Sequence, residues 1–175
     1  LLGGLGAEVI KVERPETGDP CRYNPPFANP GQVSFDRQAD GDLSLIFLKR
    51  NRGKKSITLN LRSEKGREIF KKLAAKVDVV LENFTPGVMD RLGLGYEALK
   101  EVNPKIIYCS ISGLGQSGPY KDLQAYDLVI QAMSGVMAIT GHEDGPPLRV
   151  GFLIGDQCAA LFAVIGILSA YIARQ

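Results

Sequence analysis

Two hydrophobic patterns alternate along the chain, and this alternation constrains its fold more than any other feature. Short apolar runs with β-branched residues, typical of strands, lie at 8–12, 56–61, 79–82 and 106–112. Segments with apolar residues at helical spacing lie at 64–76, 96–102 and 125–133, and a last helix is predicted to begin at or just after Asp156. Strands that alternate with helices predict a parallel sheet covered by helices, which is an α/β fold.

Residues 18–42 interrupt this alternation. They are rich in Pro, Asn, Gly and Asp and hold neither period for long, so we predict a long surface excursion there. No boundary is visible elsewhere, and residues 1–175 are interpreted as one α/β unit. The chain begins without Met and ends within an apolar helical pattern, so we expect it to be cut from a larger chain at both ends.

Composition excludes several classes of protein. Hydrophobic residues make up 45% of the chain and charged residues 23%, as in a folded soluble domain. The net charge of +2 is too small to indicate nucleic acid as a partner. Three cysteines without a C-x-x-C or Cys/His spacing indicate neither a disulfide framework nor a zinc site, and we expect a cytoplasmic location.

The stretch 158–173 has no charged residue and is the one candidate for a membrane span. It is shorter than the roughly 20 residues that cross a bilayer, and Asp156 and Arg174 bracket it closely. We therefore predict a helix buried in protein, and no membrane partner.

The string Gly113-Leu-Gly115-Gln-Ser-Gly118 is a G-x-G-x-x-G that directly follows a predicted strand. In a dinucleotide site the third glycine would lie in a helix packed on that strand. Here Pro119 follows at once and the next helical pattern begins only near residue 125. We therefore predict no tightly bound cofactor.

The single histidine, His142, lies in a Gly-rich turn without a second ligand nearby, so no metal site is predicted.

Positive charge is concentrated in residues 49–55, where five of seven side chains are cationic, and Lys11 and Arg14 lie at the end of another predicted strand. Runs of charge are commonly solvated surface. Ligands of open α/β sheets, however, gather at the carboxyl ends of strands, and mixed Arg and Lys side chains can hold several phosphates. A polyphosphate-bearing ligand is therefore a second interpretation.

Asp156 is the strongest chemical candidate because it lies between an apolar run and the last predicted helix. A carboxylate there would sit at a helix amino terminus, where free N–H groups and the helix dipole favour its ionised form. Asp is also a common helix cap without further function. Asp127, at the start of another predicted helix, competes for the same role. The residues alone leave these interpretations open.

Seven strings in order along the chain carry a resemblance to a known family. They are LGAEVIKVERP (5–15), NRGKKSITLNL (51–61), DVVLENFTPG (78–87), DRLG (90–93), SGLGQSGP (112–119), AYD (125–127) and GD (155–156). Together they resemble the family III CoA-transferases, a group that includes formyl-CoA, carnitinyl-CoA and succinyl-CoA transferases and the α-methylacyl-CoA racemases.

The resemblance implies a Rossmann-like parallel sheet with helices on both faces, the CoA-binding large domain of an interlocked homodimer. A small domain would follow residue 175. By position in the motifs, the residues that look like the lining of the CoA site are Arg14, Leu59, Asn60, Arg62, Asn83, Phe84, Arg91, Tyr126 and Asp127. Asp156 looks like the nucleophile of the transferases.

This resemblance implies a function as well as a fold. A CoA-transferase of this kind moves CoA from an acyl-CoA to a small carboxylic acid through an aspartyl mixed anhydride and an enzyme-CoA thioester, so CoA is substrate and product. The racemases have a His at the position of Tyr126, and Tyr titrates too high to replace it easily. An acyl-CoA racemase or epimerase and a non-catalytic CoA-binding module remain the alternatives, and the fragment alone is not expected to be active.

Overall fold

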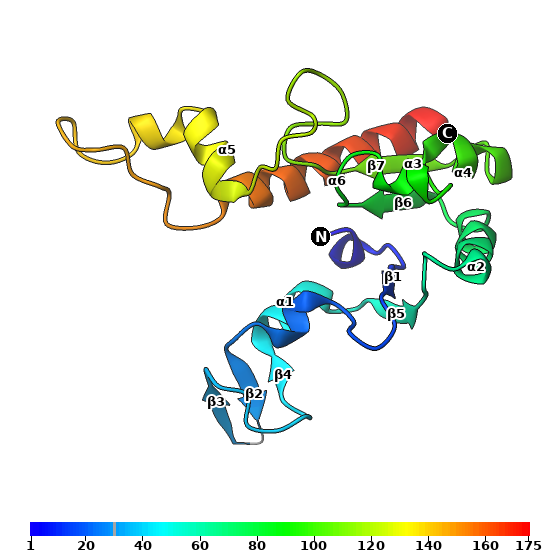
Figure 1. The fold of residues 1–175 in the computed structure, drawn as a ribbon, viewed down its shortest axis with the longest axis horizontal. Coiled ribbons are helices and arrows are strands. Elements are labelled where there is room, and N and C mark those ends of the chain that lie inside the picture. The colour runs from blue at the N-terminus through cyan, green and yellow to red at the C-terminus, as the bar shows by residue number, and fades with distance from the viewer. Residues whose placement is uncertain (30) are drawn as a thin grey trace. The chain divides into compact units, whose positions relative to one another are not determined.

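The computed structural model describes residues 1–29 and 31–175 as an α/β chain with two compact units, residues 1–66 and residues 67–175 (Figure 1). The α/β class predicted from the alternation of strands and helices is confirmed.

The parallel part of the first unit is a pair of strands. β1 (Ile10–Glu13) pairs with β5 (Lys55–Thr58) in parallel, with Ile10 opposite Lys55 and Glu13 opposite Thr58. The N–H of Leu59 donates to the carbonyl of Glu13 at 3.0 Å and extends the ladder. Because the strands are parallel, their carboxyl ends share one edge, from which the segments that carry Arg14 and Leu59 emerge.

The rest of this unit contains short regular elements within the surface excursion predicted over 18–42. The 3-10 helix η2 (Pro20–Tyr23) and the short strands β2 (Phe27–Asn29) and β3 (Gln32–Ser34) lie in that region, and β4 (Leu43–Ser44) directly follows it; Pro30 lies outside the described residues. The strands form an antiparallel sheet in the order β3-β2-β4. Strands of two or three residues are too short to show a period, which is why the sequence pattern missed them.

Two further helices belong to the first unit. The 3-10 helix η1 spans Leu2–Leu5, and α1 spans Leu45–Asn51. The Oγ of Ser44 caps α1 by accepting a hydrogen bond from the N–H of Phe47 at 3.2 Å. The basic run therefore begins in the last turn of α1 and ends in β5.

A second parallel pair forms the sheet of the second unit. β6 (Val79–Glu82) pairs with β7 (Ile107–Ser110), and Glu82 lies opposite Ser110 at the carboxyl edge. The helices around them are α2 (Glu64–Ala74), α3 (Val88–Arg91) and α4 (Tyr96–Val102). The buried apolar core of this region consists of Ala74, Val80, Met89, Leu94, Leu99 and Ile106.

The last part of the chain contains α5 (Asp127–Met133), the 3-10 helix η3 (Val136–Ile139) and the long helix α6 (Ile154–Arg174). α6 runs alongside β7, and α5 packs near its amino-terminal end (Figure 1). α6 begins two residues before Asp156, slightly earlier than predicted.

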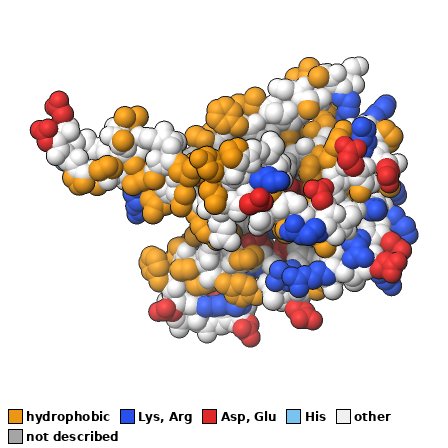
Figure 2. Space-filling view, turned by 45° about the horizontal axis from the view of Figure 1, so that its top comes forward, with side chains coloured by type: hydrophobic (Ala, Val, Ile, Leu, Met, Phe, Trp, Pro, Cys, Tyr) orange, Lys and Arg blue, Asp and Glu red, His pale blue; other side chains and the backbone are white. Residues whose placement is uncertain are grey.

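α6 is far less covered than predicted. We predicted a helix buried in protein, but Ile167 is its only buried residue, and Phe162 and Ile172 are 71% and 72% exposed. Figure 2 shows many apolar side chains at the surface. At 21 residues α6 is also the one helix among the described residues that is long and apolar enough to cross a membrane. The described residues cover one side of this helix only, so its other apolar side chains remain at the surface.

The sheets are smaller and more mixed than predicted. Instead of a single parallel sheet, the described residues form two parallel pairs and one three-stranded antiparallel sheet. The parallel connections themselves follow the prediction, because β6 reaches β7 through α3 and α4.

Candidate functional site

The carboxyl ends of β1 and β5 carry four of the predicted site residues. Arg14 follows β1 directly and is exposed, and its guanidinium makes no hydrogen bond or ion pair with any described residue. Leu59 and Asn60 follow β5, and the side-chain oxygen of Asn60 accepts a hydrogen bond from the N–H of Arg62 at 3.0 Å. Parallel pairing thus brings the predicted residues of this unit to one edge.

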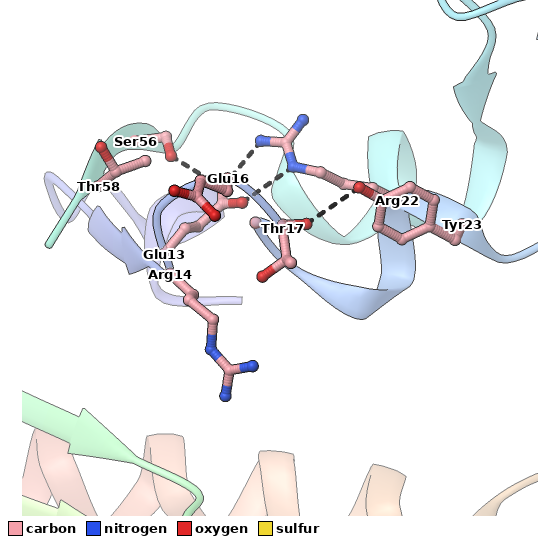
Figure 3. A pocket seen from close by; sticks show the side chains of 9 residues that line it. Glu13, Arg14, Glu16, Thr17, Arg22, Tyr23, Ser56 and Thr58 are labelled. Carbon is pink, nitrogen blue, oxygen red and sulfur yellow. Dashed lines mark hydrogen bonds and ion pairs between the residues drawn. The ribbon is translucent and has the colours of Figure 1, made fainter. Parts of the chain in front are cut away.

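A buried carboxylate lies beside Arg14 in the sequence and organises the turn that follows β1. Glu13 is 5% exposed and accepts two hydrogen bonds from the guanidinium of Arg22, both at 2.9 Å. It also accepts bonds from the Oγ of Ser56 at 2.8 Å and the N–H of Asp19 at 2.9 Å. Figure 3 shows the bonds from Arg22 and Ser56 to Glu13, with the side chain of Arg14 pointing away from them.

Glu13 remains ionised over almost the whole pH range. The hydrogen bonds from Arg22 lower its pKa from 4.5 to about 2, although burial acts in the opposite direction. The same pairing raises the pKa of Arg22. The cluster borders an open cavity of about 230 Å³, which Arg14, Thr17 and Tyr23 also line.

Several cations that the sequence grouped as a phosphate-binding cluster have partners within the first unit. Lys11 forms an ion pair with Asp19 and donates to the side chain of Asn51 at 3.0 Å. Lys55 pairs with Glu8 at 2.6 Å, on the exposed surface. Burial and the nearby charge of Lys11 lower the pKa of Lys54. Arg14 is the cation at this edge whose charge the described residues leave uncompensated.

In the second unit the carboxyl ends of β6 and β7 meet in the same way. Asn83 follows β6 and its Nδ2 donates to the carbonyl of Ile111, just after β7, at 2.8 Å. Phe84 is 45% exposed, and its N–H donates to the carboxylate of the buried Glu82 at 2.7 Å. The structure therefore presents Asn83 and Phe84 at a strand edge.

Glu82 connects this edge to the glycine-rich loop. Its carboxylate accepts a hydrogen bond from the Oγ of Ser110, which accepts one from the side chain of Gln116 at 2.6 Å. Burial and the charge of Glu82 raise the pKa values of the Tyr108 phenol and the Cys109 thiol. These two groups therefore stay neutral at neutral pH.

The G-x-G-x-x-G string is a loop that does not open a helix, as its sequence context indicated. Gly115 and Gly118 have positive φ values of 87° and 95°, and α5 begins only at Asp127. A Cβ on Gly113 would lie 2.7 Å from the Cβ of Ala125. The first glycine therefore permits close contact with the segment that leads into α5.

Asp156 lies in the first turn of α6, with an exposed side chain. Its carboxylate makes no hydrogen bond or ion pair with the residues that the structure describes. Asp156 is thus an accessible carboxylate and does not cap α6.

Asp127 caps α6 instead. Its Oδ1 accepts hydrogen bonds from the N–H of Gly155 at 2.7 Å and from the N–H of Asp156 at 3.2 Å. The N–H groups of Ile154 and Gln157 donate to the carbonyls of Phe152 and Leu153. This corrects the expectation of free N–H groups at this helix terminus, because all four have acceptors.

The remaining predicted residues are exposed. Tyr126 is 77% exposed at the N-cap position of α5, and Arg91 lies at the end of α3. A Cβ on Gly87 would come within 3.0 Å of the guanidinium of Arg91, so the glycine leaves room for that side chain. The roles predicted for these residues in CoA binding stay predictions.

Sequence reasoning missed three buried polar residues, Glu13, Glu82 and Gln131. Gln131 is 2% exposed, donates to Asp127 Oδ2 at 2.6 Å and accepts from the N–H of Val150 at 2.8 Å. Each lies in a strand or helix whose sequence pattern shows that a polar side chain is present but not that this side chain is buried. Their partners are between two and 43 positions away and become visible only in three dimensions.

Among residues 1–29 and 31–175, no group of three or more His, Cys, Asp or Glu side chains is placed to hold a metal ion. The three cysteines are free.

Comparison with known proteins gives matches over the whole chain. The model of CoA-transferase family III matches residues 1–175. An acetyl-CoA:oxalate CoA-transferase of Acetobacter aceti is 48% identical, and the match covers 100% of this chain and 42% of the relative. A succinyl-CoA:glutarate CoA-transferase of Mus musculus is 47% identical over 99% of this chain and 37% of the relative.

A solved structure agrees with these matches. The crystal structure of a CAIB/BAIF family protein from Brucella suis has a TM-score of 0.88 and 46% identity, and the match covers 99% of this chain and 44% of that one. The chain spans about two fifths of the length of the relatives that it matches.

Proposed function

The chain belongs to CoA-transferase family III, and from this premise we propose that the whole protein moves CoA from an acyl-CoA to a small carboxylic acid through Asp156. The observation that carries the proposal is that the Asp156 carboxylate is exposed and has no partner among the described residues. This carboxylate lies in the first turn of α6, while the backbone beneath it is held by Asp127.

A carboxylate suits this chemistry because it preserves the activation of the acyl group. A carboxylate oxygen of Asp156 attacks the thioester carbon, the C–S bond breaks, and CoA leaves as a thiolate, so that a mixed anhydride of Asp156 and the donor acid remains. The thiolate then attacks the aspartyl carbonyl carbon, which releases the donor acid and leaves CoA joined to Asp156 as a thioester. The acceptor carboxylate then attacks the aspartyl thioester and releases the CoA thiolate, which attacks the acceptor carbonyl of the new mixed anhydride. This second step forms the product acyl-CoA and regenerates the Asp156 carboxylate, so no net proton is consumed.

The strand-end residues support binding of the CoA portion. Arg14 is a cation without a partner among the described residues, and a guanidinium can hold a phosphate through paired hydrogen bonds. Phe84 offers an exposed ring, and Asn83 lies beside it at the end of β6. By their positions in the sequence motifs, we propose Leu59, Asn60, Arg62, Arg91 and Tyr126 as further residues of the CoA site.

The acceptor is proposed to be a small dicarboxylate, because the names of the relatives specify oxalate and glutarate. We also propose a Rossmann-like parallel sheet, a homodimer and a cytoplasmic location for the whole protein. Three unpaired cysteines support the location.

The test is an Asp156→Asn variant of the full-length protein. Asn has nearly the same shape but does not attack a thioester, so we expect transfer between acyl-CoA donors and dicarboxylate acceptors to fall to background. CoA binding, followed by calorimetry, should change little. Mass spectrometry of the wild-type protein after incubation with acyl-CoA should locate a covalent CoA adduct on the peptide that contains residue 156.

A matched control is Asp122→Asn, which removes an exposed carboxylate from the loop before α5. Its turnover should equal that of the wild-type protein. Transfer that persists in Asp156→Asn would overturn the assignment of the nucleophile. Exchange of the proton next to the thioester carbonyl, without an adduct, would favour a racemase.

A further inference from the structure

Two aspartates that lie 29 positions apart in the sequence are joined in the structure. Asp127 is 7% exposed, at the first position of α5, and its carboxylate reaches the amino terminus of α6. One oxygen accepts the N–H groups of Gly155 and of Asp156 itself. The backbone of the proposed nucleophile is therefore bonded directly to a buried carboxylate.

The second oxygen of Asp127 is held as well. It accepts the side-chain amide of Gln131 at 2.6 Å, and Gln131 in turn accepts the N–H of Val150 and donates to the carbonyl of Phe152 at 3.3 Å. Asp127 and Gln131 lie one helical turn apart on α5. Together they bond to the segment before α6 and to its first turn, so neither part can shift without breaking charge-assisted or buried hydrogen bonds.

The contact between α5 and the start of α6 leaves little room for α6 to move. A Cβ on Gly155 would lie 3.1 Å from Asp127 Oδ1 and 3.4 Å from the side chain of Ile130. α6 therefore approaches α5 closely at the residue that precedes Asp156. The side chain of Asp156, one residue later, is exposed.

We infer that Asp127 is a positioning residue, whose carboxylate fixes the first turn of α6 and thereby orients the Asp156 carboxylate for attack on the thioester. This inference rests on the proposed function and deepens it. It assigns the side chain of Asp127 to the support of the nucleophile, in place of a direct contact with CoA.

The test compares Asp127→Ala and Asp127→Asn with the wild-type full-length protein in single-turnover experiments. The rate and the amplitude of CoA-adduct formation at Asp156 are measured separately by quenched-flow mass spectrometry. We expect Asp127→Ala to slow adduct formation by about 10²-fold, because small displacements of a nucleophile have effects of that size. The final amplitude and the KM for acyl-CoA should stay close to wild type. Asp127→Asn keeps an acceptor oxygen and should recover part of the rate.

Rate and amplitude separate positioning from a merely structural role. A variant that only unfolds part of the population would lower the amplitude and leave the rate constant of the remaining enzyme unchanged. Hydrogen exchange followed by mass spectrometry supplies an independent measurement. In Asp127→Ala the amides of the first turn of α6 should exchange faster, and those of its later turns should not.

The control is Asp144→Asn, which removes an exposed carboxylate from the loop before α6 and should leave the adduct rate unchanged. A wild-type rate in Asp127→Ala overturns the inference, as does a rise in the KM for acyl-CoA with kcat unchanged, which would mark Asp127 as a binding residue. Failure of the wild-type protein to form an adduct would overturn the proposed function as well, so the two failures are distinguishable.

Discussion

At the residue scale, buried carboxylates rather than exposed ones organise this chain. Glu13, Glu82 and Asp127 are all buried, and each accepts hydrogen bonds from backbone N–H groups near the end of a strand or the start of a helix. A buried charge is tolerated only when such bonds compensate the loss of water. These residues therefore fix the backbone that presents the exposed residues of the proposed site.

Glu13→Gln should destabilise the protein. The substitution keeps the shape of the side chain but removes the charge that two Arg22 hydrogen bonds compensate, and we expect a loss of about 1–2 kcal/mol in the free energy of unfolding, since Arg22 is partly exposed. Urea denaturation measures this loss. The control is Glu8→Gln, because the Glu8–Lys55 pair is exposed and its removal should leave the midpoint almost unchanged.

The effect of Glu13→Gln should depend on pH in a defined direction. Because folding lowers the pKa of Glu13 from 4.5 to about 2, the carboxylate contributes stability that is fully present above pH 4.5. That contribution to the free energy of unfolding is lost as the pH falls from 4.5 towards about 2. The difference in unfolding free energy between wild type and variant should therefore shrink in acid; a difference that grows in acid would contradict the assignment.

At the element scale, helices and strands with long local patterns follow the prediction, and those held by distant partners do not. β6 and α4 have the predicted bounds, and α2 begins after Ser63, whose Oγ accepts the N–H of Gly66 at 3.1 Å. The start of α6 was placed two residues late because its cap comes from another helix. The strands in 27–34 were missed because their pairing, and no internal period, defines them.

The same division applies to the site. Motif position predicts roles for Arg14, Asn83 and Asp156, and the structure shows each of them exposed, after a strand or in the first turn of a helix; their roles stay predictions. The supporting residues Gln131 and Glu82 were not identified, because nothing in their neighbourhood distinguishes a buried polar side chain with partners from a solvated one. Their hydrogen bonds to Asp127 and Ser110 depend on how the elements pack.

Leu99 is the buried residue of α4. Leu99 is fully buried, whereas Val102 on the same helix is 40% exposed. Leu99→Ala should cost about 3 kcal/mol in the free energy of unfolding, because it leaves a cavity between α4 and its neighbours. Val102→Ala should change that free energy by less than about 0.5 kcal/mol. Thermal unfolding of both variants measures the contrast, and equal effects would show that α4 is not anchored by Leu99.

At the scale of the whole molecule, the exposed apolar surface is the dominant feature. Leu161, Phe162, Ile165 and Ile172 on α6 are exposed, and so are Leu128 and Met133 on α5. Contiguous apolar surface of this kind usually marks a contact. Since the relatives are more than twice as long as this chain, we expect α6 to be covered in the full-length protein.

Alkylation of Cys158 tests this expectation. Cys158 lies on α6 and is exposed, whereas Cys109 is partly buried and has a pKa raised by burial. In residues 1–175 alone, Cys158 should react with a thiol reagent much faster than Cys109. In the full-length protein the reaction of Cys158 should slow strongly, because covered thiols are inaccessible. Equal rates in the two proteins would show that α6 stays uncovered.

The bond between Asp127 and the first turn of α6 also bears on protein engineering. A designer who transplants the turn that contains Asp156 into another scaffold would transfer the reactive side chain without its anchor, because that anchor is supplied by a different helix. The smallest portable part is therefore discontinuous and comprises the start of α5, the start of α6 and the spacing between them. Insertions in the intervening loop should be tolerated only while that spacing is kept.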